Sequence, residues 1–124
     1  MIRIVIVDDH ILIRKGIVNT LSVDPSIQIL GEAASGNEAI TIINQYKPDI
    51  VILDMHLPDM TGLQVALWAN ENLKDTRIVF HTGSKNIFLI RQMLLPNVYG
   101  ILTKDNPEQL INAVNHYRLK AVAS

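Results

Sequence analysis

A buried run that stops at a carboxylate constrains this chain more than any other feature. Residues 50–53 read Ile-Val-Ile-Leu, three of them β-branched, and Asp54 follows directly. Pro58 and Gly62 come within the next eight residues. Short continuous apolar runs closed by turn residues are typical of strands that are covered on both faces of a sheet. The stretch therefore predicts a central buried strand with Asp54 as an exposed acidic tip.

The composition is typical of a globular protein. Of 124 residues, 48% are apolar and 19% charged, and the formal net charge is -1. These values predict one domain over residues 1–124 and exclude a disordered or strongly nucleic-acid-binding chain. No apolar run is long enough for a membrane span or a signal peptide, and the absence of cysteine excludes disulfides and thiolate metal sites. We expect a cytoplasmic domain.

Strand and helix patterns alternate along the whole chain. Further strands are predicted at residues 2–7, 27–34, 77–81 and 99–103, and helices at 13–21, 35–47, 63–70, 87–95 and from 106 onward. Ser35 is followed by Glu38 at the spacing of a capping box. Asn106 is a predicted cap, with Pro107 at the first helical position and Gln109 at the third.

Five strands that alternate with helices predict an α/β fold with a five-stranded parallel sheet and helices on both faces. The flavodoxin-like, doubly wound order 2-1-3-4-5 suits five strands. It makes the first and third strands neighbours and opens a crevice at their carboxyl ends. Asp8, Asp9 and Asp54 fall in that crevice, and Thr82 and Lys104 end the next two strands at the same rim.

Three carboxylates at adjacent strand ends repel one another, so the pattern predicts a bound cation. Oxygen ligands without cysteine favour Mg²⁺ over zinc. Mg²⁺ and the ammonium of Lys104 would neutralise phosphoryl oxygens, and the hydroxyl of Thr82 would donate to another. One carboxylate could then act as a nucleophile and form an aspartyl phosphate.

Each candidate residue also has a structural interpretation. Asp8 and Asp9 could cap the first helix, and Asp54 could be a turn residue ahead of Pro58. Their joint placement in one crevice favours the functional interpretation. The histidines have no metal-ligand spacing, which argues against a metal-imidazole site and predicts that His81 is a half-buried strand residue.

The motifs resemble those of the response-regulator receiver domains of two-component signal transduction, over essentially the whole chain. The matching residues are the acidic pair Asp8-Asp9, Asp54 with Pro58 and Gly62 after it, the step Thr82-Gly83, and Lys104. Five motifs in order at matching strand ends are a specific signal. The resemblance implies that Asp54 is the phosphoacceptor and that Thr82 and Lys104 bind the phosphoryl group. It also implies that Asp9, Asp54 and the carbonyl of His56 hold Mg²⁺, with Asp8 assisting.

The runs Asp8-Asp9-His10, Arg14-Lys15-Gly16 and Lys104-Asp105 are similar to the NarL/FixJ-type subfamily. This resemblance implies a sensor histidine kinase or phosphotransfer protein as phosphodonor, a possible homodimer, and no membrane partner. It also implies transcription control through a helix-turn-helix domain beyond Ser124. Such a chain is a regulator that promotes its own phosphotransfer and dephosphorylation rather than a conventional enzyme. A stand-alone receiver that acts through protein contacts is the alternative.

Two other functional classes fit less well. A haloacid-dehalogenase-type phosphatase needs a general acid two residues after its nucleophile, where this chain has His56. A flavin-binding domain needs a neutral first loop for its phosphate, and Asp8-Asp9-His10 would repel one. Within the receiver family, Ile101 stands where many members have Tyr or Phe. Tyr99 has the same strand parity and could lie on the same face.

Overall fold

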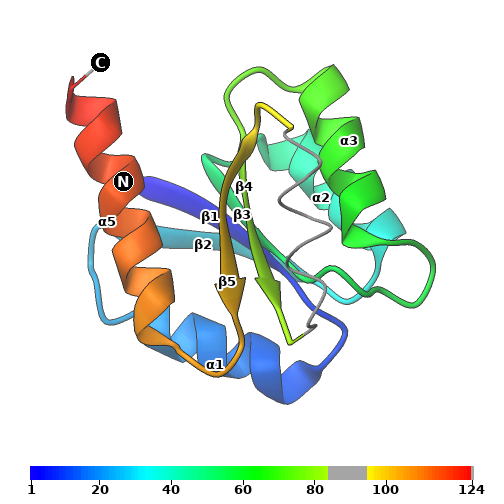
Figure 1. Ribbon diagram of the computed structural model, residues 1–124, viewed down its shortest axis with the longest axis horizontal. Helices are drawn as coiled ribbons and strands as arrows, with labels where there is room; N and C mark the ends of the chain where they lie inside the picture. Colours follow the sequence, from blue (N-terminus) through cyan, green and yellow to red (C-terminus); the bar gives the residue numbers. More distant parts are fainter. Residues whose placement is uncertain (84–94, 124) are drawn as a thin grey trace.

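Five parallel strands form one sheet in the order β2-β1-β3-β4-β5, with helices on both faces, in the computed structural model (Figure 1). The structure describes residues 1–83 and 95–123. The elements are β1 (Ile2–Val7), α1 (Ile11–Leu21), β2 (Ile27–Ala33), α2 (Gly36–Tyr46), β3 (Ile50–Leu53), α3 (Gly62–Asn72), β4 (Arg77–Thr82), β5 (Val98–Thr103) and α5 (Glu108–Ala123). The predicted flavodoxin-like, doubly wound order is confirmed. Residues 87–94 of the helix predicted at 87–95 lie outside the described residues.

Two apolar clusters sandwich the sheet, and β3 supplies both of them. Val51 and Leu53 pack on the side covered by α2 and α3, whereas Ile50 and Ile52 pack on the side covered by α1 and α5 (Figure 1). All four side chains are fully buried, which contributes roughly 1.5–3 kcal/mol each. The alternation follows from the two-residue period of a strand. Because β3 is held on both faces, the position of Asp54 at its end is set by the core.

The predicted capping box at the start of α2 forms only in part. Ser35 accepts from the backbone N of Glu38 (3.2 Å), as predicted. The carboxylate of Glu38 is 3.4 Å from the backbone N of Ala34, so it does not complete the predicted box. A full capping box instead begins α3, where Thr61 and Gln64 bond reciprocally.

The last helix begins slightly later than predicted. Its first helical residue is Glu108, not Pro107. The side-chain oxygen of Gln109 accepts from the backbone N of Thr103 at 3.2 Å. Gln109 therefore ties the start of α5 to the end of β5, beside Lys104.

A register shift in the β4–β5 pair separates Tyr99 and Ile101, which strand parity alone would place on the same face. The pairing shifts by one residue at Tyr99. The Tyr99 ring packs on the α5 side of the sheet, with ring centroids 5.4 Å from His116 and 5.9 Å from Tyr117. Ile101 packs into the opposite cluster. Strand parity does not hold here because an extra residue in one strand resets the alternation of side chains.

Among the helices of the described residues, none has the length and apolarity required to cross a bilayer.

Candidate functional site

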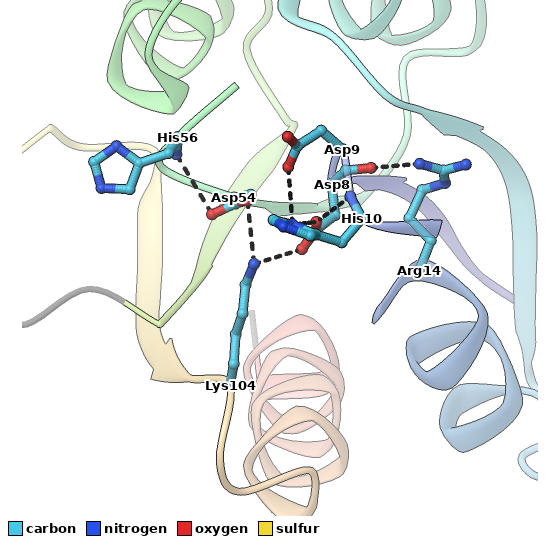
Figure 2. A network of polar contacts seen from close by, with 7 residues as sticks. All are labelled: Asp8, Asp9, His10, Arg14, Asp54, His56 and Lys104. Atoms are coloured by element: carbon cyan, nitrogen blue, oxygen red, sulfur yellow. Dashed lines mark hydrogen bonds and ion pairs between the residues drawn. The ribbon is translucent and has the colours of Figure 1, made fainter. Parts of the chain in front are cut away.

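The acidic side chains of β1 and β3 converge at the carboxyl edge of the sheet. The two strands are paired up to Val7 and Leu53, and the backbone N of Asp54 donates to the carbonyl of Val7 (2.9 Å). This places Asp54 beside Asp8 and Asp9 (Figure 2). One ligand atom from each of these carboxylates, together with one from His10, lies within 4.8 Å of the others. Three carboxylates and an imidazole therefore lie close enough together at this edge to hold one metal ion.

Lys104 reaches this cluster from the end of β5 and joins two of its carboxylates. Its Nζ lies 2.8 Å from Oδ2 of Asp8 and 3.1 Å from Oδ2 of Asp54. Burial opposes the charge on Lys104, but its hydrogen bonds and ion pairs with Asp8 and Asp54 prevail and raise the pKa of its ammonium. Lys104 therefore stays charged and partly neutralises the carboxylates (Figure 2).

Asp54 is buried, with 4% of its surface exposed, so the prediction of an exposed tip is wrong. The backbone of His56, in the loop after β3, and Lys104, at the end of β5, lie against its carboxylate, which a strand pattern alone does not reveal. Burial raises the pKa of Asp54, the charge of Asp8 raises it further, and Lys104 acts in the opposite direction. A buried carboxylate with a perturbed pKa, beside a lysine and a cluster that can hold a metal, is typical of functional sites.

His10 joins the cluster, although the sequence pattern argued against a metal-imidazole site. Its Nδ1 lies 3.0 Å from Oδ1 of Asp9 and 3.3 Å from Oδ1 of Asp8. The only signal for this in the sequence is that His10 directly follows the acidic pair. Spacing between histidines carries no information about a site whose other ligands are carboxylates.

Arg14 was also not predicted as a site residue. Its Nη1 donates to the carbonyl oxygen of Asp8 (2.6 Å), and its Nε lies 3.3 Å from Oε1 of Glu32. These contacts fasten the end of β1 to α1 and to the neighbouring edge strand β2. Arg14 therefore supports the backbone that carries Asp8.

The loop after Asp54 folds back against the backbone of that residue. The backbone N of Gly62 donates to the carbonyl of Met55 (2.6 Å). A Cβ atom at Gly62 would lie 2.2 Å from the carbonyl oxygen of Asp54, which no side chain can tolerate. The predicted role of the segment from Pro58 to Gly62 in shaping this loop thus has a steric basis at Gly62.

Asp59, in the same loop, binds the start of α2. Its two carboxylate oxygens accept from the backbone N atoms of Gly36 (2.7 Å) and Asn37 (2.9 Å). These hydrogen bonds lower the pKa of Asp59. A carboxylate at a helix N-terminus satisfies free N–H groups and the helix dipole. The residue is distant in sequence from α2, so only the fold reveals it as a cap.

The remaining predicted residues lie around the same rim. Thr82 is buried at the end of β4, and its carbonyl oxygen accepts from the backbone N of Lys104 (3.1 Å). The backbone N of His56 lies 3.4 Å from Oδ1 of Asp54, while its imidazole points away from the cluster (Figure 2). His81 is buried rather than half-buried, on the face of β4 where residues of α1 and α5 line a pocket with it.

The amino-acid sequence of the chain matches known proteins over most of its length. Residues 4–115 match the family described as response regulator receiver domain. The chain is 33% identical over 114 residues to the probable transcriptional regulatory protein NarL of Mycobacterium tuberculosis. It is 32% identical over 113 residues to the nitrate/nitrite response regulator protein NarL of Escherichia coli. These matches cover 91% and 90% of the chain and 53% and 52% of the relatives, so the chain spans about half of their length.

Solved structures agree with the fold. The signal receiver domain of the putative response regulator NarL from Mycobacterium tuberculosis superposes with a TM-score of 0.85 at 33% identity, covering 93% of this chain and 94% of that one. The receiver domain of AraT, a response regulator from Geobacillus stearothermophilus, gives a TM-score of 0.88 at 25% identity, covering 99% and 98%.

Proposed function

This chain belongs to the response-regulator receiver family, and from that premise we propose that Asp54 accepts a phosphoryl group from a phosphohistidine of a sensor histidine kinase or phosphotransfer protein. The observation that carries the proposal is the burial of Asp54 against Lys104, whose ammonium also contacts Asp8. Receivers are in general not enzymes, and the covalent product here serves as the signal. As part of the proposal, the domain promotes its own phosphorylation and dephosphorylation.

The transfer uses the carboxylate of Asp54 as nucleophile. A carboxylate oxygen forms a bond to phosphorus as the phosphorus–nitrogen bond of the donor breaks, and the donor imidazole keeps the electron pair of that bond. The phosphoryl group brings additional negative charge into a site that already holds Asp8. Lys104 lies 3.1 Å from Asp54, close enough to pair with a phosphoryl oxygen, and Thr82 at the end of β4 would donate to another.

The same residues suit Mg²⁺, which would neutralise phosphoryl oxygens when bound. We propose Asp8, Asp9, Asp54 and the backbone carbonyl of His56 as its ligands. The support is chemical, because the cluster offers hard carboxylate oxygens whose mutual repulsion a cation relieves. Lys104 contacts the Oδ2 atoms of Asp8 and Asp54, which leaves their Oδ1 atoms and the carboxylate of Asp9 for a cation.

The names of the relatives support a proposal for the whole protein. Both NarL relatives are described as regulators, one of them transcriptional, and each is about twice as long as its match to this chain. We infer that phosphorylation in the cytoplasm switches an output surface that controls a DNA-binding domain beyond Ser124, with a homodimer as one possible form. A stand-alone receiver acting by protein contacts would share the chemistry and lack that domain.

Phosphorylation by a small donor tests the assignment of Asp54. Incubation with acetyl phosphate and Mg²⁺ should add one acid-labile phosphoryl group, seen as a mass increase of about 80 Da that hydroxylamine removes. Asp54→Asn should abolish the increase, and Asp59→Asn, in the same loop but bonded to α2, should retain it. Full labelling of Asp54→Asn would disprove the assignment.

A further inference from the structure

We propose that the imidazole of His10 is a ligand of the cation at this site, so that the site favours Mn²⁺, which accepts a nitrogen ligand more readily than Mg²⁺ does, by more than carboxylates alone would provide. The inference deepens the proposed function and rests on the carboxylate cluster binding a cation. It concerns a side chain that is not among the ligands proposed above.

The distances fit a shared coordination sphere. Neighbouring ligands of an octahedral ion with bonds of about 2.1 Å are about 3.0 Å apart, and opposite ligands are about 4.2 Å apart. The Nδ1 atom of His10 is 3.0 Å from Oδ1 of Asp9 and 3.3 Å from Oδ1 of Asp8. One ligand atom from each of these residues and one from Asp54 lie within 4.8 Å of one another, close to the separation of opposite ligands.

The backbone holds His10 at the cluster, and helix capping does not occupy its side chain. His10 is the N-cap residue of α1, yet its side chain makes no capping hydrogen bond. Its backbone N instead donates to Oδ1 of Asp8 (2.9 Å). Figure 2 shows the ring turned toward the carboxylates of Asp8 and Asp9. The ring therefore faces the cluster although it is largely exposed and has solvent available as an alternative.

Lys104 and His10 approach the cluster by different oxygen atoms. Lys104 pairs with the Oδ2 atoms of Asp8 and Asp54, and His10 lies against the Oδ1 atoms of Asp8 and Asp9 (Figure 2). In the acidic pair, Lys104 leaves open Oδ1 of Asp8 and both oxygen atoms of Asp9, and Oδ1 of each aspartate lies beside Nδ1 of His10. A cation held by the pair through these atoms meets the ring. An entering ion therefore either accepts this nitrogen as a ligand or has to displace it.

These two cases predict opposite effects of removing the imidazole. Both ions prefer oxygen ligands such as carboxylates, but Mn²⁺, as a transition-metal ion, accepts an imidazole nitrogen more readily than Mg²⁺ does. If the ring is a ligand, His10→Gln weakens Mn²⁺ binding far more than Mg²⁺ binding. If the ring only obstructs the site, the same substitution strengthens the binding of both ions.

Competition calorimetry with Mn²⁺ and Mg²⁺ on the purified chain measures this selectivity without any phosphoryl transfer. We expect His10→Gln to lower Mn²⁺ affinity about tenfold and Mg²⁺ affinity less than about twofold. The matched control is His116→Gln, which removes an imidazole from α5, where its ring contacts Tyr99. This control should leave both affinities at the wild-type values.

Electron spin echo spectroscopy of the Mn²⁺-loaded protein reports the ligand directly. A nitrogen modulation should be present in the wild type and in His116→Gln, and absent in His10→Gln. Equal or increased affinities for both ions in His10→Gln, no nitrogen modulation in the wild type, or no Mn²⁺ binding would each overturn the proposal. Acetyl phosphate labelling of Asp54 is a separate readout, so the ligand role of His10 can fail while the phosphoacceptor assignment holds.

Discussion

Asp54 and Asp59 lie five residues apart, at the start of one loop and within it, and their surroundings shift the pKa values of the two carboxyl groups in opposite directions. Asp54 ends β3 inside the cluster, where burial and then the charge of Asp8 raise its pKa. Asp59 lies farther along, where two backbone N–H groups of α2 lower its pKa. The ionised carboxylate of Asp54 thus lowers the stability of the folded state, whereas that of Asp59 raises it. A site must tolerate such a cost because its reacting group has to face other charges.

Gly62→Ala should have the largest effect, because it disturbs the loop that holds both aspartates. The new Cβ would lie 2.2 Å from the carbonyl oxygen of Asp54, and neither backbone segment can move without losing its hydrogen bonds. We expect a loss of about 3 kcal/mol in the free energy of unfolding, measured by urea denaturation.

The matched control is Gly16→Ala in α1, where a Cβ meets nothing within 4 Å. That substitution should stabilise the helix by roughly 0.5–1 kcal/mol. A loss at Gly62 no larger than the effect at Gly16 would contradict the steric account of the loop.

Asp54→Asn should stabilise the protein at pH 7 without added metal. A folded-state pKa above the unfolded value means that the folded state holds more protons, so stability falls as pH rises above about 4. The neutral amide removes the cost of a buried charge, so the thermal midpoint of Asp54→Asn should exceed that of the wild type by several degrees.

The difference between Asp54→Asn and the wild type should disappear at about pH 3, where the wild-type carboxyl is protonated in both states. Thermal melts from pH 3 to 8 in the presence of a chelator measure it. A midpoint below that of the wild type at pH 7 would show that the ion pair with Lys104 outweighs burial and the charge of Asp8.

Asp59→Asn should have the smallest effect and the opposite sign. A folded-state pKa below the unfolded value gives stability that is present above about pH 4 and is lost as pH falls. The amide keeps a hydrogen-bond acceptor and loses the charge at the helix N-terminus, so the thermal midpoint should fall by a few degrees at pH 7.

Melts of Asp59→Asn in high salt provide a further check, because its side chain is near the surface and salt screens its attraction to α2. The destabilisation should shrink as salt rises. A rise in the midpoint at pH 7 would mean that Asp59 and Asp54 experience similar environments, and the contrast between them would fail.

The sequence by itself determined the order of the strands and which residues lie at the carboxyl edge of the sheet. Apolar runs such as residues 50–53, each followed by polar residues and a helix pattern, allow few arrangements other than a doubly wound sheet. Strand ends in such a sheet meet at one edge, so Asp8, Asp54 and Lys104 could be brought together from their positions along the chain alone.

Only the tertiary structure decided how each of these side chains is used. Burial of Asp54, capping of α2 by Asp59 and the turn of the His10 ring toward the acidic pair depend on segments that are distant in sequence or on side-chain rotation. The opposite faces of Tyr99 and Ile101 depend on one extra residue in β5. Patterns in a sequence report periodicity within an element, whereas pKa values, caps and register depend on the contacts between elements.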